Sequence, residues 1–300
     1  MNNLTTGRWS GRLAGAVAAI ALTAGFTTAP ATAAPAPPAP VYIAAPATAA
    51  LAPPAPVYIA LGDSYAAGTG GGAYTASAAG LPAACLQTAA SYPEVRDATL
   101  NLGCFGAKTT DVIDVANGYS GVLSAATVVT VTVGGNDVDT GQVAHACTAS
   151  ASSPDCKAAL YNSLVVKLRE LPGKITKMLT TIKSLAPNAR VVLTGYPRLF
   201  TVGAGLTAEQ TQAARSMNSA ADLLNATIAF SALVNRTGYV SVADRFTGHG
   251  IGSANPWIVA PTGLCTLTIN CSLSPFDAFH PTAIGYRDGY AAALAAARVP

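Results

Sequence analysis

The sequence predicts an α/β fold of three layers, a sandwich in which helices cover both faces of a five-stranded parallel sheet. Short runs of β-branched residues alternate with longer stretches of helical periodicity along most of the chain. The segment at 127–133 reads TVVTVTV and is the clearest of the short runs. Its unbroken β-branched character is typical of a central strand that is buried on both faces.

The expected strands and helices follow one another in a regular order. The strands are expected at 57–61, 98–102, 127–133, 190–194 and 239–242. Helical periodicity fills 160–185, 207–234 and 282 to about 298. Pro172-Gly173 should break or kink the first helix, because proline lacks an N–H and clashes with the preceding turn. A capping box opens the second helix, with Thr207 at the cap and Gln210 three residues later.

The first residues of the chain are typical of an export signal. Arg8 and Arg12 precede an apolar run at 13–26 that is short for a membrane span, and small residues at 31–33 suit signal peptidase. We expect residues 1–34 to be a cleaved signal peptide, with no stable membrane insertion after cleavage. The alternative is a retained membrane anchor, which the lack of a basic flank after the run disfavours.

Residues 35–54 are expected to be a Pro/Ala-rich linker that carries part of a tandem duplication. Residues 29–44 read APATAAPAPPAPVYIA and residues 45–60 read APATAALAPPAPVYIA, so the copies differ only at Pro35 and Leu51. Only the second copy continues into LGDS, which makes the first VYIA a surplus strand sequence. We interpret the duplication as neutral, with a functional role as the alternative.

Residues 55–300 are long enough for one domain with a well-buried core. Charged residues make up 10% of the chain, and loss of Arg8 and Arg12 with the leader lowers the formal net charge from +3 to +1. This balance excludes a basic stripe for nucleic acid, so we expect small or neutral partner molecules. A monomer is the default expectation.

The six cysteines point to three disulfides rather than to metal ligands, because their number is even and the chain is expected to be exported. Spacing alone leaves every connectivity open. The histidines His145, His249 and His280 do not form a metal-ligand cluster such as H-E-x-x-H, so no metal site is expected.

Polar residues that are suited to nucleophilic catalysis follow the first and third expected strands. Ser64 lies directly after the first strand, where a serine hydroxyl needs a neighbouring base to become a nucleophile. Asn136 follows the third strand, and its side-chain amide offers donors for an oxyanion hole. Each has a plain structural alternative, because Ser64 also suits a helix cap and GGND at 134–137 also suits a turn.

A carboxylate and an imidazole lie near the C-terminus, in DAFHP at 277–281. Asp277 can hold one ring nitrogen of His280 protonated while the other nitrogen accepts a proton from a serine. A single histidine is more often structural than catalytic. The case depends on all these groups meeting at one edge of a parallel sheet, where ligands bind beyond the carboxyl ends of the strands.

Taken together, these motifs resemble the SGNH, or GDSL, hydrolases, and within them the secreted actinomycete lipases and esterases with three disulfides. The first, third and fifth blocks of that family match GDS at 62–64, GGND at 134–137 and DAFHP at 277–281. The second block matches NLGCFGA at 101–107, in which Gly106 is the expected oxyanion glycine. The similarity extends from Val57 to the C-terminus.

The resemblance implies a flavodoxin-like sheet and a serine hydrolase mechanism. Ser64 would be the nucleophile, His280 the base and Asp277 its orienting partner. The backbone N–H groups of Ser64 and Gly106 would form the oxyanion hole with the Asn136 amide. The implied disulfides are sequential, Cys85–Cys104, Cys147–Cys156 and Cys265–Cys271, and no cofactor or metal is required.

Some residues depart from the family pattern. Tyr65 replaces the leucine of the GDSL name. Phe105 and Lys108 lie where small hydroxyl residues are expected, and Gly103 competes with Gly106 for the oxyanion role.

The resulting hypothesis is a secreted, extracellular serine esterase or lipase that cleaves carboxylic esters of acyl lipids or small acyl esters through an acyl-enzyme intermediate. One alternative is a carbohydrate O-acetyl esterase, and another is a catalytically silent cell-wall or carbohydrate-binding protein. Aromatic residues for stacking on sugars would be Tyr74, Tyr119, Trp257 and Tyr286, although they could equally pack the domain. We expect loops at 66–97 and 196–206 to set the acyl-chain preference.

Overall fold

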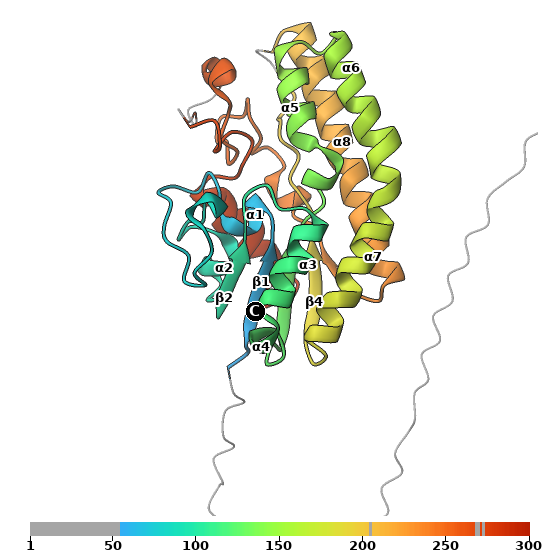
Figure 1. Ribbon diagram of the computed structural model, residues 1–300. Helices are drawn as coiled ribbons and strands as arrows, with labels where there is room; N and C mark the ends of the chain where they lie inside the picture. The colour runs from blue at the N-terminus through green and yellow to red at the C-terminus, as the bar shows by residue number, and fades with distance from the viewer. Residues whose placement is uncertain (1–54, 204–205, 268–270, 272–273) are drawn as a thin grey trace, which may run out of the picture. The chain divides into compact units, whose positions relative to one another are not determined.

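The computed structural model describes residues 55–203, 206–267, 271 and 274–300 (Figure 1). All of them belong to one compact unit, residues 53–300. The expected signal peptide at 1–34 and linker at 35–54 lie outside the described residues. No helix in the described part of the chain is long and apolar enough to cross a membrane.

A five-stranded parallel sheet forms the centre of this unit (Figure 1). Its strands are β1 (Tyr58–Gly62), β2 (Leu100–Gly103), β3 (Val128–Thr132), β4 (Arg190–Thr194) and β5 (Gly238–Val240). They lie in the order β2-β1-β3-β4-β5, and all neighbouring pairs are parallel. The predicted fold class is therefore confirmed. Strand β2 lies on one side of β1 and strands β3 to β5 lie on the other, so the strand order reverses between β1 and β3. Sheets of this kind bind ligands at such a point.

Buried hydroxyl groups in the central strand are paired with tyrosines on one face of the sheet. Thr130 shares a hydrogen bond of 2.9 Å with the Tyr58 hydroxyl, and Thr132 shares one of 2.8 Å with the Tyr92 hydroxyl. Because each hydroxyl has a partner, these threonines satisfy the demand that buried polar groups be hydrogen-bonded.

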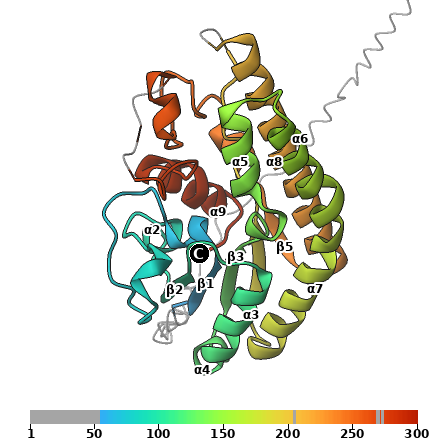
Figure 2. The ribbon, with the colours of Figure 1, turned by 45° about the horizontal axis from the view of Figure 1, so that its top comes forward.

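Helices cover both faces of the sheet (Figure 2). Helices α3 (Thr109–Gly118), α7 (Leu168–Leu185) and the second half of α8 (Ala208–Val234) pack on one face. The opposite face is covered by α2 (Tyr92–Val95), the π-helical segment η6 (Gly285–Ala291) and α9 (Ala292–Ala296). The sheet thus has an apolar layer on each side, as the sequence predicts.

The remaining elements are short or lie beyond the edge of the sheet. The helices are α1 (Ser64–Ala67), α4 (Ser120–Leu123), α5 (Thr140–Ala149) and α6 (Pro154–Tyr161), and the π-helical segment η3 spans Asn162–Lys167. The 3-10 turns are η1 (Ala83–Cys85), η2 (Asn136–Val138), η4 (Ala243–Phe246) and η5 (Thr262–Leu267).

One expected helix break is absent, and the other expected helices are present. Helix α7 continues through Pro172 instead of breaking there, and the irregular turn lies upstream, in η3. The carbonyl one turn before Pro172 belongs to Leu168, where the π-helical and α-helical segments meet, so the irregular turn accommodates the proline ring. The last helix is present where it was expected, and it is π-helical over most of its length. The capping box of α8 is confirmed, because Thr207 and Gln210 exchange hydrogen bonds of 2.9 and 3.1 Å.

Two of the three implied disulfides are present, Cys85–Cys104 and Cys147–Cys156. Cys271 is also disulfide-bonded. The side chain of Cys265 lies outside the described residues, so its pairing with Cys271 stays a prediction.

Candidate active site

Ser64 lies at the carboxyl end of β1, where the chain turns sharply into α1. The turn requires glycine at 62, because its φ is +138° and a Cβ atom there would lie 2.2 Å from the Thr132 carbonyl oxygen. The Asp63 carboxylate accepts a hydrogen bond of 2.9 Å from the Tyr65 N–H, and α1 begins at Ser64. The serine hydroxyl is thereby fixed at the edge of the sheet.

His280 contacts Ser64 directly. Its Nε2 lies 2.7 Å from the Ser64 Oγ, and its Nδ1 lies 3.0 Å from the Ala278 carbonyl oxygen. A carbonyl only accepts, so Nδ1 carries the proton and Nε2 is left to accept from the serine. Burial lowers the pKa of His280 to about 4, although the hydrogen bond to Ala278 opposes this shift. The imidazole is therefore neutral at neutral pH, and its unprotonated Nε2 accepts the hydrogen bond from Ser64.

The orienting contact differs from the one expected of Asp277. The Asp277 carboxylate accepts a hydrogen bond from the Tyr74 hydroxyl, and the Ala278 carbonyl occupies the position beside Nδ1. The cause is a tight turn in which the His280 N–H donates to the Asp277 carbonyl at 3.1 Å. Phe279 within this turn has a φ of +66°, and this conformation brings the Ala278 carbonyl back toward the ring.

Tyr65 also contacts this turn. Its hydroxyl donates a hydrogen bond of 2.7 Å to the Phe279 carbonyl, and its ring centroid lies 5.1 Å from that of His280. The residue that departs from the GDSL name is thus tied to the loop that carries the imidazole. Sequence reasoning noted the departure but assigned no role to this side chain.

Two backbone N–H groups near the Ser64 hydroxyl are available for an oxyanion, those of Ser64 and Gly106. The Ser64 N–H is at the first position of a helix and has no acceptor within it. Gly103 is excluded as a donor, because its N–H donates to the Asn101 side chain at 2.9 Å. Gly106 has a φ of +78°, and among the described residues its N–H has no protein acceptor. Gly106 is therefore the better placed of the two glycines.

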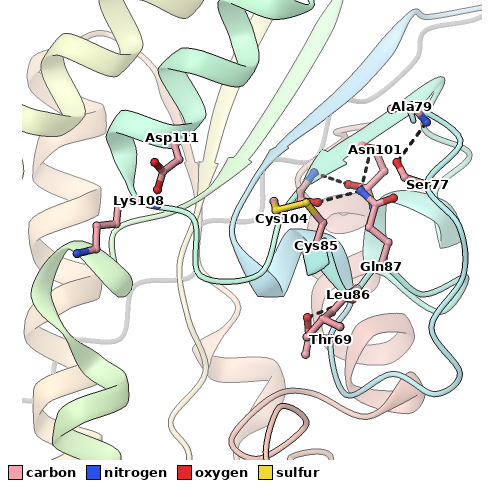
Figure 3. The surroundings of a disulfide bond; sticks show 11 residues. Thr69, Ser77, Ala79, Cys85, Leu86, Gln87, Asn101, Cys104, Lys108 and Asp111 are labelled. Atoms are coloured by element: carbon pink, nitrogen blue, oxygen red, sulfur yellow. Dashed lines mark hydrogen bonds between the residues drawn. A yellow bond between two sulfur atoms is a disulfide. The ribbon is translucent and has the colours of Figure 1, made fainter. Parts of the chain in front are cut away.

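The segment before Gly106 is held by the first disulfide (Figure 3). Cys104 is bonded to Cys85, and the Phe105 N–H donates to the Cys85 carbonyl at 3.0 Å. The Gln87 side chain donates to the carbonyls of Asn101 and Gly103 at 3.0 and 2.8 Å. These contacts fix the path of the chain from β2 to Gly106.

Asn136 and Asp137 join the turn after β3 to the turn after β2. The Asn136 side-chain amide donates a hydrogen bond of 3.0 Å to the Ala107 carbonyl. Its second hydrogen is left for a ligand. The buried Asp137 carboxylate accepts from the N–H and the hydroxyl of Thr109 at 2.9 and 2.7 Å. Gly106 and Asn136 are thus brought to one edge of the sheet.

Tyr196 is a residue of the site that sequence reasoning missed. Its hydroxyl donates to the Asp63 carboxylate at 2.5 Å and accepts from the Gly135 N–H at 3.1 Å. Burial raises the pKa of Asp63 to about 7, and the Tyr196 hydrogen bond opposes the shift. The bridge links the turn of Ser64 to the turn of Asn136. The position of Tyr196 just after the fourth expected strand is the sequence signal that could have identified this residue.

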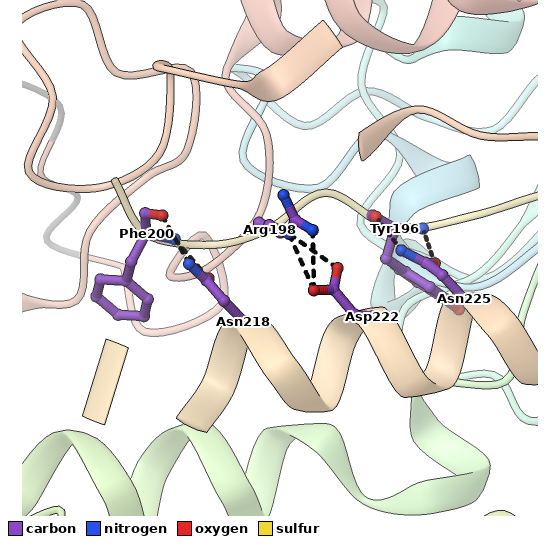
Figure 4. Close-up of polar contacts among 6 residues, drawn as sticks. All are labelled: Tyr196, Arg198, Phe200, Asn218, Asp222 and Asn225. Atoms are coloured by element: carbon purple, nitrogen blue, oxygen red, sulfur yellow. Dashed lines mark hydrogen bonds and ion pairs between the residues drawn. The ribbon is translucent and has the colours of Figure 1, made fainter. Parts of the chain in front are cut away.

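A row of side chains on α8 holds the segment that carries Tyr196 (Figure 4). Asn225 makes two hydrogen bonds to the Tyr196 backbone, at 2.7 and 2.8 Å. One and two turns earlier, Asp222 pairs with Arg198 and Asn218 bonds the Phe200 backbone. Positions 218, 222 and 225 lie on one face of α8, with the spacing i, i+4, i+7. They meet positions 200, 198 and 196, which are every second residue of the extended segment.

A cavity of about 650 Å³ opens at Ser64 and His280. Its apolar wall is formed largely by α5 and α8 and by the segment at 274–280. Among the described residues, the titratable side chains of its lining are Asp63, His145 and His280, along with two tyrosines. Of the loops at 66–97 and 196–206, only Tyr196 and Leu199 are among the described lining residues, so the influence of these loops on acyl-chain preference stays a prediction.

The described lining of this cavity includes none of the aromatic residues expected to stack on sugars, which are Tyr74, Tyr119, Trp257 and Tyr286. Tyr286 is fully buried and donates to the Thr69 carbonyl at 2.8 Å, so it is a core residue. Trp257 stacks on His249 with ring centroids 3.7 Å apart. In the described part of the chain, no group of three or more His, Cys, Asp or Glu side chains is arranged to hold a metal ion.

Comparisons with known proteins agree with this arrangement. The model of the GDSL-like Lipase/Acylhydrolase family matches residues 60–287. Lipase 1 of Streptomyces coelicolor is 31% identical over 236 residues, which are 77% of this chain and 82% of that protein.

Two crystal structures from Streptomyces have the same fold. The extracellular lipase of Streptomyces rimosus has a TM-score of 0.70 and 29% identity, over 81% of this chain and 100% of that one. Phospholipase A1 of Streptomyces albidoflavus NA297 has a TM-score of 0.69 and 31% identity, over 81% of this chain and 99% of that one.

Proposed function

Because this chain belongs to the GDSL-like lipase/acylhydrolase family and is a carboxylic ester hydrolase, we propose that Ser64 and His280 are its catalytic pair. The observation that carries the proposal is the 2.7 Å contact between the Ser64 Oγ and the His280 Nε2. This contact lies at the opening of the apolar cavity. A serine beside a neutral imidazole is the arrangement that activates a hydroxyl for acyl transfer.

The proposed reaction has two steps. The Ser64 Oγ attacks the ester carbonyl while the His280 Nε2 takes the hydroxyl proton, and the tetrahedral intermediate then expels an alcohol that receives this proton. Water, activated by the same imidazole, hydrolyses the acyl-enzyme and restores the serine. The N–H groups of Ser64 and Gly106 and the free Asn136 amide hydrogen would stabilise the oxyanion.

We assign the orientation of the imidazole to the Ala278 carbonyl rather than to the Asp277 carboxylate. The 3.0 Å contact at Nδ1 supports this assignment. Asp277 then acts on His280 through its negative charge, which favours the imidazolium formed during the reaction.

We also propose that the enzyme is secreted and that residues 1–34 direct its export. The relative from Streptomyces rimosus is an extracellular lipase. The disulfides Cys85–Cys104 and Cys147–Cys156 are typical of proteins from oxidising compartments.

Acyl lipids and acyl esters fit the site better than acetylated sugars. A two-carbon acetyl group leaves most of the 650 Å³ apolar cavity empty, whereas a cavity of this size suits a much larger apolar group. The contact between Ser64 and His280 also disfavours a catalytically silent binding protein.

The test is hydrolysis of p-nitrophenyl esters from acetate to palmitate by the oxidised protein that begins near Ala34, in parallel with the Ser64→Ala variant. We expect turnover by the wild-type protein and its loss in Ser64→Ala. Wild-type turnover that survives in Ser64→Ala would show that another group is the nucleophile. Turnover restricted to acetate, with release of acetate from acetylated xylan, would favour the O-acetyl esterase instead.

A further inference from the structure

A second cavity lies behind the wall of the first. It has a volume of about 260 Å³ and is lined by residues from the end of α5, from the first half of α8 and from Phe200. Three residues line both cavities, namely Thr148 of α5, Met217 of α8 and Gly263. The wall between the two spaces is therefore thin, and Met217 supplies its largest side chain.

The first cavity extends along α8 from the catalytic edge toward Met217. Leu224 and Met217 both line it and are seven residues apart on the same face of the helix. At about 1.5 Å per residue they are roughly 10 Å apart along the axis. Leu224 is next to Asn225, which holds Tyr196 beside Asp63, so the Leu224 end is the catalytic end.

Figure 4 shows the order of the residues along the segment that runs beside α8. Tyr196, whose hydroxyl is hydrogen-bonded to Asp63, lies at one end of the segment 196–200 that α8 holds. Phe200 lies at the other end. Asn218, the neighbour of Met217, bonds the backbone of Phe200, and Phe200 lines the second cavity. Met217 thus lies at the end of the first cavity that is remote from Ser64 along α8.

We propose that Met217 sets the upper limit of acyl-chain length, because its side chain separates the acyl-binding cavity from the second cavity. This inference rests on the proposed function, since the acyl carbon must be held at Ser64 for the chain to run along α8. Met217 is 4% exposed and packed in the core, so it is part of the wall and not a surface side chain. Removing it would join the two spaces and admit longer chains.

The substrate class that follows is an ester of a long, unbranched and uncharged acyl group. Met217, Ala220, Ala221 and Leu224 give the α8 side of the cavity an apolar lining. Binding along such a wall is expected to gain affinity with each methylene until the chain reaches Met217.

The experiment compares chain-length profiles of kcat/KM for p-nitrophenyl esters from acetate to stearate. Each value is divided by the value for acetate, because the acetyl group is too short to reach Met217 and loss of folded enzyme cancels in the ratio. For Met217→Ala, we expect the decline at long chains to move to longer esters, with the relative rate for the longest ester rising at least about tenfold. Met217→Leu should keep the wild-type limit, because leucine fills nearly the same space.

Two further variants make the result specific. Ala213 lines only the second cavity, so Ala213→Leu in the Met217→Ala background should restore the wild-type limit by filling that space. Leu223→Ala removes a half-exposed side chain of the same helix that lines neither cavity, and its profile should match the wild type. If Met217→Ala does not fold, Met217→Val provides the same comparison with a smaller loss of volume.

An unchanged profile in folded Met217→Ala or Met217→Val overturns the role of Met217. A shifted profile that Ala213→Leu does not reverse overturns the role of the second cavity. Failure of the proposed function is distinguishable from both, because Ser64→Ala would then hydrolyse the acetate ester as fast as the wild type.

Discussion

The charge of Asp277 is predicted to matter far less than a triad carboxylate would. Asp277→Asn keeps the size of the side chain and an oxygen that can accept the Tyr74 hydrogen bond, but removes the charge. The proton on the His280 Nδ1 keeps its acceptor, since the Ala278 carbonyl lies 3.0 Å away. The substitution therefore tests whether charge or geometry orients the imidazole.

The expected magnitude follows from the position of the carboxylate. Asp277 is half-buried, and a partly exposed charge pair contributes about 0.2–1 kcal/mol. About 1.4 kcal/mol corresponds to a tenfold change in rate, so kcat should fall by less than about tenfold. Loss of the carboxylate that orients a triad histidine lowers kcat by about 10⁴-fold.

The assay is kcat at pH 7 on a p-nitrophenyl ester, for the wild type, Asp277→Asn and Tyr74→Phe. Tyr74→Phe is the matched control, because it removes the hydrogen bond to Asp277 and leaves the charge. A fall near 10⁴-fold in Asp277→Asn, in protein with wild-type melting temperature, would refute the assignment to Ala278 and restore Asp277 as the orienting group.

Three further outcomes are expected. Burial lowers the pKa of His280 from 6.5 to about 4, so the imidazole stays neutral until the pH falls to about 4. The acid limb of the pH profile of kcat/KM should therefore have its midpoint near pH 4, and a midpoint near 6.5 would contradict this. Tyr196→Phe should lower kcat about tenfold with little change in KM, because it removes the bridge between Asp63 and Gly135, and unchanged kcat would exclude that positioning role. Replacing Cys85 and Cys104 by serine should lower the free energy of unfolding by about 3 kcal/mol, because the disulfide joins residues 19 apart in sequence. Denaturant titration measures this change, and equal stability would show that other contacts hold the loop.

The sheet and the edge at which the site lies could be predicted from the sequence. The β-branched run at 127–133 becomes the buried central strand β3, and Ser64 lies just after β1 as expected, although the residue that caps α1 is Asp63 and not Ser64. These predictions succeeded because burial and alternation of elements are encoded locally, and because parallel strands place their carboxyl ends together. The pairing of Ser64 with His280 was predicted from their residue types and from the family resemblance, and their catalytic roles stay predictions.

The parts that were not predicted depend on backbone geometry or distant contacts. The Ala278 carbonyl has no sequence signal, because its position depends on the positive φ of Phe279. The backbone of Tyr196 is held by Asn225, which is 29 residues away in sequence. Pro172 is tolerated because the neighbouring turn is π-helical, a feature that apolar periodicity does not reveal.

The most direct test of the central claim is covalent labelling with the serine-directed inhibitor diethyl p-nitrophenyl phosphate, followed by intact-mass and peptide analysis. We predict one diethylphosphoryl adduct per chain, located on Ser64, with loss of esterase activity in proportion to labelling and no adduct in Ser64→Ala. An adduct on another residue that abolishes activity, or full inhibition of Ser64→Ala turnover by the same reagent, would contradict Ser64 as the nucleophile.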